Sequence, residues 1–327
     1  MIRMPLPRST PQAENISEKG IRSYLETIRK SALPYHSIMM IRNGKVIEEC
    51  FFGNYTPETE HPVYSVAKVI TATACCFARN EKLFDIHDKV ISFFPEKLPV
   101  SDDARLEELE IYHLLTMTVG HEAAKLSAES EKGNKDWISL FLSAPVIHPP
   151  GTVFEYNNLA SYMLSAIIQK LSEQKLIDYI RPRLFDPLGI EQSEWEESPQ
   201  GINTGGWGIS LKTEDMAKLG LFLLQKGQWE NRELLPENLV EETCSFQVPT
   251  APETATDDEK SKSDWLQGYG YHIWRSRHNA FSAYGFHGQL IVVLPDKNTV
   301  LVTTAKIGDM QGALNLIWKY ILPSLKT

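Results

Sequence analysis

The sequence predicts an α+β fold, in which one antiparallel β-sheet from both chain ends, flanked by terminal helices, carries an inserted, mostly helical domain. Short runs rich in β-branched and aromatic residues lie near the N-terminus and again after residue 264. The segment between them has mostly helical periodicity. Strands at both ends with helices between them indicate one sheet interrupted by an insertion. We therefore expect a discontinuous sheet domain, 1–55 and 264–327, and a helical insertion domain, 56–263.

The N-terminal part predicts a helix followed by a hairpin. Residues 16–30 place Ile21, Leu25 and Ile28 on one stripe, which is typical of an amphipathic helix. Two apolar runs then flank Asn43-Gly44, and both of these residues tolerate the positive φ of a tight turn. We expect two strands that meet at this turn.

The middle of the chain predicts helices, and its end predicts strands. The expected helices are 65–80, 111–118, 137–142, 159–171, 213–226 and 236–244. Two polar stretches, 127–135 and 251–263, predict exposed loops. The expected strands are 268–275, 281–285, 290–294 and 299–304, followed by a last helix at 310–321.

Composition and charge make several classes of partner improbable. The 327 residues carry a formal net charge of -9, so no overall basic field is available to bind nucleic acid or an anionic membrane. No run of about 18 apolar residues predicts a membrane-spanning helix, and the first residues lack the apolar core of a signal peptide. The four cysteines match no metal or redox spacing, which favours a reducing compartment. We expect a cytoplasmic protein with no nucleic acid or membrane partner; the sequence leaves its oligomeric state open.

A serine and a lysine three residues apart occur twice, as Ser65-Val-Ala-Lys68 and as Ser172-Glu-Gln-Lys175. Ser172 and Lys175 lie at the polar end of a predicted helix, where such residues are ordinary caps. Ser65 instead opens a helix whose following turns are apolar. The two contexts therefore point to different roles for the same spacing.

The placement of Ser65 has chemical consequences. Residues three apart share a helix face, so the amine of Lys68 can reach the hydroxyl of Ser65. Apolar surroundings lower the pKa of a lysine, and a neutral amine can accept the serine proton. The helix N-terminus supplies backbone N–H groups to a developing negative charge. The alternative is that Ser65 only caps the helix and Lys68 is solvated.

A second group, Tyr156-Asn157-Asn158, lies before the helix predicted at 159–171. A tyrosinate beside a lysine could act as a general base, and the Asn158 amide could hold a substrate carbonyl or the lysine. Taken alone, the group fits a half-buried tyrosine next to a helix-capping asparagine better than a catalytic site.

A third group, Ala283-Tyr-Gly285-Phe286-His287-Gly288-Gln289, falls between or within predicted strands. A glycine inside a strand indicates close approach of another group to the backbone. A backbone N–H here could join that of Ser65 in an oxyanion hole. A bulged edge strand is the alternative.

In combination these motifs resemble the serine β-lactamase and penicillin-binding protein superfamily, in particular its class C-like branch of esterases, amidases and peptidases. The Ser-x-x-Lys pattern belongs to that superfamily, and Tyr156-Asn-Asn158 fits the Tyr-x-Asn motif of the class C-like branch. Further landmarks follow in family order, so the resemblance extends from residue 36 to the C-terminus. They are Tyr64-Ser-Val-Ala-Lys, His113-Leu-Leu-Thr-Met-Thr, Pro150-Gly, Leu184-Phe-Asp-Pro-Leu-Gly, Gly205-Gly-Trp-Gly and Gly288-Gln.

The resemblance implies a role for each group and an active site at the junction of the two domains. Ser65 becomes the nucleophile, Lys68 and Tyr156 share the proton transfers, and Asn158 supports Lys68 and the substrate. The N–H groups of Ser65 and Phe286 would bind the oxyanion. The implied reaction is hydrolysis of an ester or amide bond in a small molecule through a covalent acyl-enzyme, without a cofactor.

One departure from the family pattern concerns the strand motif. The family places a lysine, or in many hydrolases a histidine, two residues before the glycine. If Gly285 is that glycine, the position holds Ala283; if Gly288 is, it holds Phe286. Neither register supplies the cation that grips the carboxylate of a penicillin or a peptide terminus. A neutral ester or amide, including a linear oligoamide, fits this sequence better.

Two aromatic residues near these motifs are open to both a functional and a structural interpretation. Trp207 either lines the pocket or packs, and His287 either reaches the site or is a structural strand histidine. The other histidines have no metal-ligand spacing, so we expect no metal. A true β-lactamase or D,D-peptidase stays open as an alternative function, and so does a non-catalytic sensor or scaffold.

Overall fold

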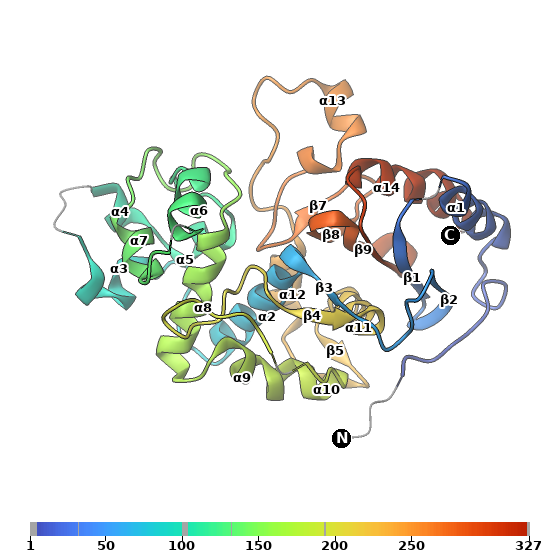
Figure 1. The fold of residues 1–327 in the computed structure, drawn as a ribbon, viewed down its shortest axis with the longest axis horizontal. Helices are drawn as coiled ribbons and strands as arrows, with labels where there is room; N and C mark the ends of the chain where they lie inside the picture. The colour runs from blue at the N-terminus through green and yellow to red at the C-terminus, as the bar shows by residue number, and fades with distance from the viewer. Residues whose placement is uncertain (1–4, 32, 100–103, 132, 193, 326–327) are drawn as a thin grey trace.

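The computed structural model describes residues 5–31, 33–99, 104–131, 133–192 and 194–325. Its main feature is a six-stranded antiparallel sheet with the order β2-β1-β10-β9-β8-β7 (Figure 1). The strands are β1 Tyr35–Arg42, β2 Lys45–Phe51, β7 Trp274–Arg275, β8 Phe281–Gly285, β9 Gln289–Leu294 and β10 Thr299–Ala305. Because β1 pairs with β10, the two chain ends meet in one sheet, and the predicted fold class is confirmed.

The predicted hairpin joins β1 to β2. Asn43 and Gly44 occupy its turn with φ of 51° and 77°, and Arg42 pairs with Lys45. Positive φ at both central residues gives a turn whose twist matches that of the flanking strands.

Helices cover both faces of the sheet. On one face, α1 (Glu18–Lys30) packs with the C-terminal helix α14 (Met310–Leu316) and the turn Ile317–Ile321 that continues it. The buried stripe of α1 consists of Ile21, Tyr24, Leu25 and Ile28, which includes the three predicted residues. Residues 1–4 and 326–327 of the expected sheet domain lie outside the described residues.

The other face of the sheet is covered by α11 (Thr213–Leu224), which contacts β1, β9 and β10. Gly220 permits this contact, because a Cβ at that position would lie 2.6 Å from Val300 Cγ1 and 2.7 Å from Ile291 Cγ2. A helix of the segment 56–263 is therefore part of the sheet's own packing. The proposed division into two domains has to accommodate this helix.

Helix α2 (Ala67–Asn80) lies between the sheet and the helices of residues 90–172 (Figure 1). It is buried on every side from Ala67 to Ala78, as expected for a helix that is apolar all round. The other helices are α3 Val90–Phe93, α4 Ala104–Glu108, α5 Ile111–Leu115, α6 Ala123–Glu131, α7 Trp137–Ser143, α8 Asn158–Ser172, α9 Leu176–Ile180, α10 Asp186–Leu188, α12 Glu237–Cys244 and α13 Asp257–Lys262.

Both predicted loops contain a short helix, so the prediction was wrong there. Helix α6 extends to Glu131, inside the expected loop 127–135, because its sequence Ala-Ala-Lys-Leu-Ser-Ala consists mostly of strong helix formers. Helix α13 lies within 251–263 and starts with a capping box, in which Thr256 and Glu259 satisfy each other's backbone N–H groups. Residue 132 lies outside the described residues.

The strand predicted at 268–275 is reduced to its last two residues, which form β7. Before them the chain turns at Gly268, whose φ is 106°, and Tyr269 bridges both Val248 and Trp274. Four short strands also occur where helices and loops are expected. They are β3 Glu60–Pro62, β4 Ser210–Lys212, β5 Gln228–Trp229 and β6 Arg232–Glu233.

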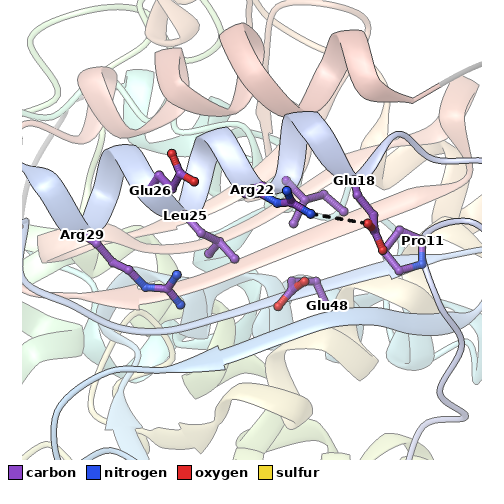
Figure 2. A pocket seen from close by; sticks show the side chains of 8 residues that line it. Pro11, Glu18, Arg22, Leu25, Glu26, Arg29 and Glu48 are labelled. Atoms are coloured by element: carbon purple, nitrogen blue, oxygen red, sulfur yellow. Dashed lines mark ion pairs between the residues drawn. The ribbon is translucent and has the colours of Figure 1, made fainter.

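A hollow of about 300 Å³ lies between α1 and β2 (Figure 2). The described residues that line it are Pro11, Glu18, Ile21, Arg22, Leu25, Glu26, Arg29 and Glu48. These offer charged and apolar groups but no serine, cysteine or histidine. Three strands separate β2 from β8, so this hollow belongs to the opposite edge of the sheet from the residues described next.

Candidate active site

Ser65 lies in a 3₁₀ turn, Tyr64–Val66, that leads directly into α2. The residue before it, Tyr64, has a φ of 48°, a conformation that costs a non-glycine residue about 1–3 kcal/mol. The strained residue lets the chain pass sharply from β3 into the helix. Ser65 therefore stands at the beginning of a buried helix, as the sequence predicts.

The side chain of Lys68 is almost completely enclosed, with 1% exposure. Its Nζ lies 3.2 Å from Ser65 Oγ, 2.8 Å from Asn158 Oδ1 and 3.0 Å from the carbonyl oxygen of Gly206. Burial lowers the pKa of this amine from 10.5 to about 7. A neutral amine has two N–H groups for Asn158 and Gly206, which leaves its lone pair for the proton of Ser65.

Tyr156, which precedes α8, lies beside Lys68. Its ring lies 4.8 Å from Lys68 Nζ. Burial raises the pKa of Tyr156, and the nearby side chain of Ser65 opposes that rise only in part. The ring of Trp274 stacks on the phenol, with centroids 5.8 Å apart.

Asn158 is the first residue of α8, and Asn157 caps that helix by accepting a hydrogen bond from Leu159 N at 2.9 Å. The cap fixes the start of α8, from which the Asn158 amide oxygen reaches Lys68. Two helix starts, those of α2 and α8, thus bring Ser65, Lys68, Tyr156 and Asn158 together.

The Gly205-Gly206 segment closes the site behind Lys68. Thr71 Oγ1 donates to Gly205 O at 2.5 Å, one helical turn beyond the bond from Lys68 to Gly206 O. A Cβ on Gly205 would lie 2.7 Å from Ser161 O, and one on Gly206 would lie 3.1 Å from Lys68 Nζ. Position 205 therefore requires glycine, and a side chain at position 206 would press on Lys68 Nζ.

Trp207, which follows these glycines, is partly exposed and packs beside Trp137, with ring centroids 6.0 Å apart. Its carbonyl oxygen accepts a hydrogen bond from Trp195 Nε1 at 2.6 Å. Neither contact involves a substrate, and a role for Trp207 in binding substrate stays a prediction.

Strand β8 ends beside Ser65. Gly285 pairs with Gln289 on β9, and a Cβ at Gly285 would collide with the carbonyl oxygen of Val63, two residues before Ser65. A Cβ at Gly288 would instead meet Ile307, 2.6 Å away, on the side of β10. Of the two registers, Gly285 is thus the glycine that faces the turn containing Ser65, and the position two residues earlier is the buried Ala283.

The next two residues turn outward. The side chain of Phe286 is 62% exposed, and His287 is partly exposed with a φ of 65°. Both rings lie against Tyr64, with centroid distances of 6.0 Å and 5.9 Å.

A family model described as beta-lactamase matches residues 21–321. This chain belongs to the β-lactamase family. Among curated proteins, protein flp of Staphylococcus aureus (strain MW2) is 25% identical over 197 residues, which cover 56% of this chain and 39% of that protein. The chain therefore spans about two fifths of the length of this relative.

Solved structures of the same fold cover nearly the whole chain. A Bacillus anthracis protein described as a candidate 6-aminohexanoate-dimer hydrolase superposes with a TM-score of 0.76 at 19% identity, over 99% of this chain and 89% of that one. EstCE1, described as a hydrolase with promiscuous acyltransferase activity, gives 0.73 at 17% identity, over 91% and 96%. At these identities the similarity establishes the fold alone.

This member of the family also has a buried pair that the sequence did not single out. His272 Nε2 lies 2.9 Å from Ser161 Oγ, and its Nδ1 lies 3.0 Å from the carbonyl oxygen of Leu115. A carbonyl only accepts, so Nδ1 carries the proton and Ser161 donates to Nε2. Burial, together with the charge of Lys68, lowers the pKa of His272 to about 3, so the ring is neutral.

The pair lies close to Lys68. A Cβ added to Gly206 would lie 3.1 Å from Lys68 Nζ and 3.4 Å from Ser161 Oγ, so both side chains border the same glycine. Ser161 could have been found from its position three residues after Asn158, on the same face of α8. His272 has no comparable signal, since it comes from a turn more than a hundred residues later.

Among the described residues, no three His, Cys, Asp or Glu side chains form a group that could hold a metal ion. None of the helices in the part of the chain that the structure describes is both long and apolar enough to span a bilayer. The expectations of a metal-free and cytoplasmic protein stay predictions.

Proposed function

We propose that this β-lactamase family member is a serine hydrolase that cleaves ester or amide bonds of small molecules through an acyl-enzyme on Ser65. The observation that carries the proposal is the enclosed amine of Lys68, 3.2 Å from Ser65 Oγ, with a pKa lowered to about 7. An amine that is neutral near physiological pH can take a proton from an adjacent hydroxyl, which an ordinary solvated lysine cannot do.

In the proposed acylation step, neutral Lys68 accepts the proton of Ser65 as Oγ forms a bond to the substrate carbonyl carbon. The tetrahedral oxyanion then expels the alcohol or amine, which takes up a proton through the Tyr156 hydroxyl and the Lys68 ammonium. In deacylation a water molecule attacks the ester of Ser65, Lys68 accepts its proton, and the proton returns to Ser65 as the acid leaves. The side chains end each cycle as they began.

The two titrating groups have unequal roles in this proposal. Burial lowers the pKa of Lys68 but raises the pKa of Tyr156. Near neutral pH this favours a lysine base and a protonated tyrosine that relays a proton, rather than a tyrosinate base. Activity is expected to rise with pH through about 7, as Lys68 becomes neutral.

The N–H groups of Ser65 and Phe286 are the proposed oxyanion donors. Their support is the contact of Gly285 with Val63, which brings the end of β8 against the turn that contains Ser65. Donors that are held in place before the reaction stabilise the developing charge most effectively.

The residue at position 283, an alanine, affects which substrates the site would accept. It occupies the family's cation position, so this strand supplies no positive charge for a substrate carboxylate. We propose a neutral ester or amide as substrate, and the description of the Bacillus anthracis neighbour is compatible with a linear amide.

A fluorophosphonate probe tests the proposal, because it phosphonylates an activated serine. We expect one adduct on Ser65, hydrolysis of p-nitrophenyl acetate, and loss of both in Ser65→Ala, with kcat/KM reduced by about 10³-fold or more. Ser172→Ala is the matched control and should keep both. No adduct and no hydrolysis, as expected for a sensor or scaffold, or labelling that persists in Ser65→Ala, would reject the proposal.

The family match favours a second candidate, a β-lactamase or D,D-peptidase. A chromogenic cephalosporin separates the two. Because position 283 lacks a cation, we expect slow turnover or none, and rapid turnover would favour the second candidate.

A further inference from the structure

Three aromatic side chains gather beside Ser65, and we call them the aromatic rim: Tyr64, Phe286 and His287. The Tyr64 ring lies edge-on to both others, at 6.0 Å and 5.9 Å, and the Phe286 and His287 rings are 4.0 Å apart. Tyr64 precedes Ser65 in the chain, and Phe286 follows Gly285, which contacts the turn that contains Ser65. The backbone of the rim residues is therefore adjacent to the proposed nucleophile.

The rim presents apolar surface to solvent. Phe286 is 62% exposed and Tyr64 is 37% exposed, although scattered exposed apolar residues are common on proteins. Here they touch one another at a nucleophile. Grouped exposed apolar side chains at one place are typical of a binding site.

The backbone holds these rings outward at a cost. Tyr64 and His287 both have positive φ, 48° and 65°, and each such residue costs about 1–3 kcal/mol. The conformation of His287 is secured by a hydrogen bond from Ile307 N to its carbonyl oxygen at 3.0 Å. Strain of this kind persists where the surrounding structure enforces it, often at functional sites.

Charge indicates what the rim would accept. Position 283 on the same strand carries no cation, and the chain has a formal net charge of -9. A carboxylate-bearing group would meet aromatic surface and an unfavourable overall charge. A neutral ring or bulky apolar group would instead bury its surface against Phe286.

We propose that the aromatic rim is a subsite for an aromatic or bulky apolar group next to the scissile bond, so that the preferred substrates are neutral esters or amides that carry such a group. This rests on the proposed hydrolase function. Covering a phenyl ring on the rim should raise kcat/KM roughly tenfold.

The test compares two matched pairs of esters at pH 8, above the lowered pKa of Lys68. One pair, ethyl and 2-phenylethyl acetate, varies the alcohol; the other, p-nitrophenyl acetate and p-nitrophenyl phenylacetate, varies the acyl group. The ratio of kcat/KM within a pair is measured for the wild type, Phe286→Ala and Phe246→Ala. Comparing the ratio between variants cancels the intrinsic reactivity of the esters.

We expect a preference for the phenyl-bearing ester in at least one pair, and a fall of that preference by fivefold or more in Phe286→Ala. Phe246, which lies after α12 and is 56% exposed, is the control, and its variant should keep the wild-type ratio. Melting temperatures would show that both variants are folded.

Equal rates within both pairs, or a preference that Phe286→Ala leaves intact, would overturn the inference and leave the hydrolase proposal standing. If no ester is hydrolysed and Ser65 is not labelled by the fluorophosphonate probe, both fail. If Ser65 is labelled but no ester is hydrolysed, the inference alone is overturned, because the rim then selects no neutral ester.

Discussion

Two segments of this chain share the Ser-x-x-Lys spacing but have opposite surroundings. Lys68 is 1% exposed and contacts three protein oxygens, those of Ser65, Asn158 and Gly206. The side chain of Lys175 is 44% exposed and forms an ion pair with Glu197 at 2.6 Å. Spacing alone therefore does not distinguish a reactive pair from a surface pair.

The position of each pair relative to its helix accounts for the difference. Ser65 precedes a helix that runs into the core, so Lys68, in the first turn, is carried inward. Ser172 ends α8, where its hydroxyl donates to Ile168 O at 2.7 Å and the following Glu173 adopts a φ of 57°. There the chain leaves the helix, and Lys175 emerges at the surface.

Removing each amine in turn is the most direct test of this difference between Lys68 and Lys175. For Lys68→Met we expect kcat/KM for p-nitrophenyl acetate to fall by about 10³-fold, because Ser65 loses its proton acceptor. For Lys175→Met we expect a change of less than about twofold, because only an exposed ion pair is lost. Comparable losses in the two variants would show that burial does not distinguish the pairs.

Asn157 and Asn158, which are adjacent in the chain, allow a second test that concerns the hydrogen-bond partner of Lys68. Asn158→Ala removes the amide oxygen 2.8 Å from Nζ, and we expect kcat/KM to fall about 10- to 100-fold as the amine loses its orientation.

Asn157→Ala is the matched change. It removes the cap of α8, so it should lower the free energy of unfolding by about 1 kcal/mol, with a smaller effect on kcat/KM than Asn158→Ala. Steady-state kinetics and urea unfolding of both variants test this. A larger kinetic loss in Asn157→Ala would contradict the assignment.

Much of the fold was predictable because local patterns and global packing agree. The Asn43-Gly44 turn and the stripe of α1 are local signals, and the structure bears both out. Helices α6 and α13 were missed because they are short and lie in polar stretches, where hydrophobic periodicity carries little information.

The candidate site was predictable where residue type carries the chemistry, as for Ser65, Lys68, Tyr156 and Asn158. The site was not predictable where a backbone group or the shape of the folded chain carries the chemistry. The Gly206 carbonyl bonds Lys68, but every residue has a carbonyl, so no residue type reveals it. The register of β8 depends on the close approach of Gly285 to Val63, which exists only in the folded chain.

Burying the amine of Lys68 has a cost in stability that depends on pH. Its pKa is about 7 in the folded protein and 10.5 ordinarily. Below pH 7 both states hold the proton, so the full cost of burial is present. Between these values the unfolded chain binds more protons than the folded one, so the free energy of unfolding rises with pH.

Lys68→Met has no such group, so the wild type should gain stability relative to this variant by about 2 kcal/mol from pH 7 to pH 9. Urea unfolding at both pH values measures the difference. The corresponding difference for Lys175→Met should stay within about 1 kcal/mol at both pH values, since it reports only an exposed ion pair. If the wild type and Lys68→Met keep a constant difference, the amine is charged in the folded protein throughout this range and could not serve as the base.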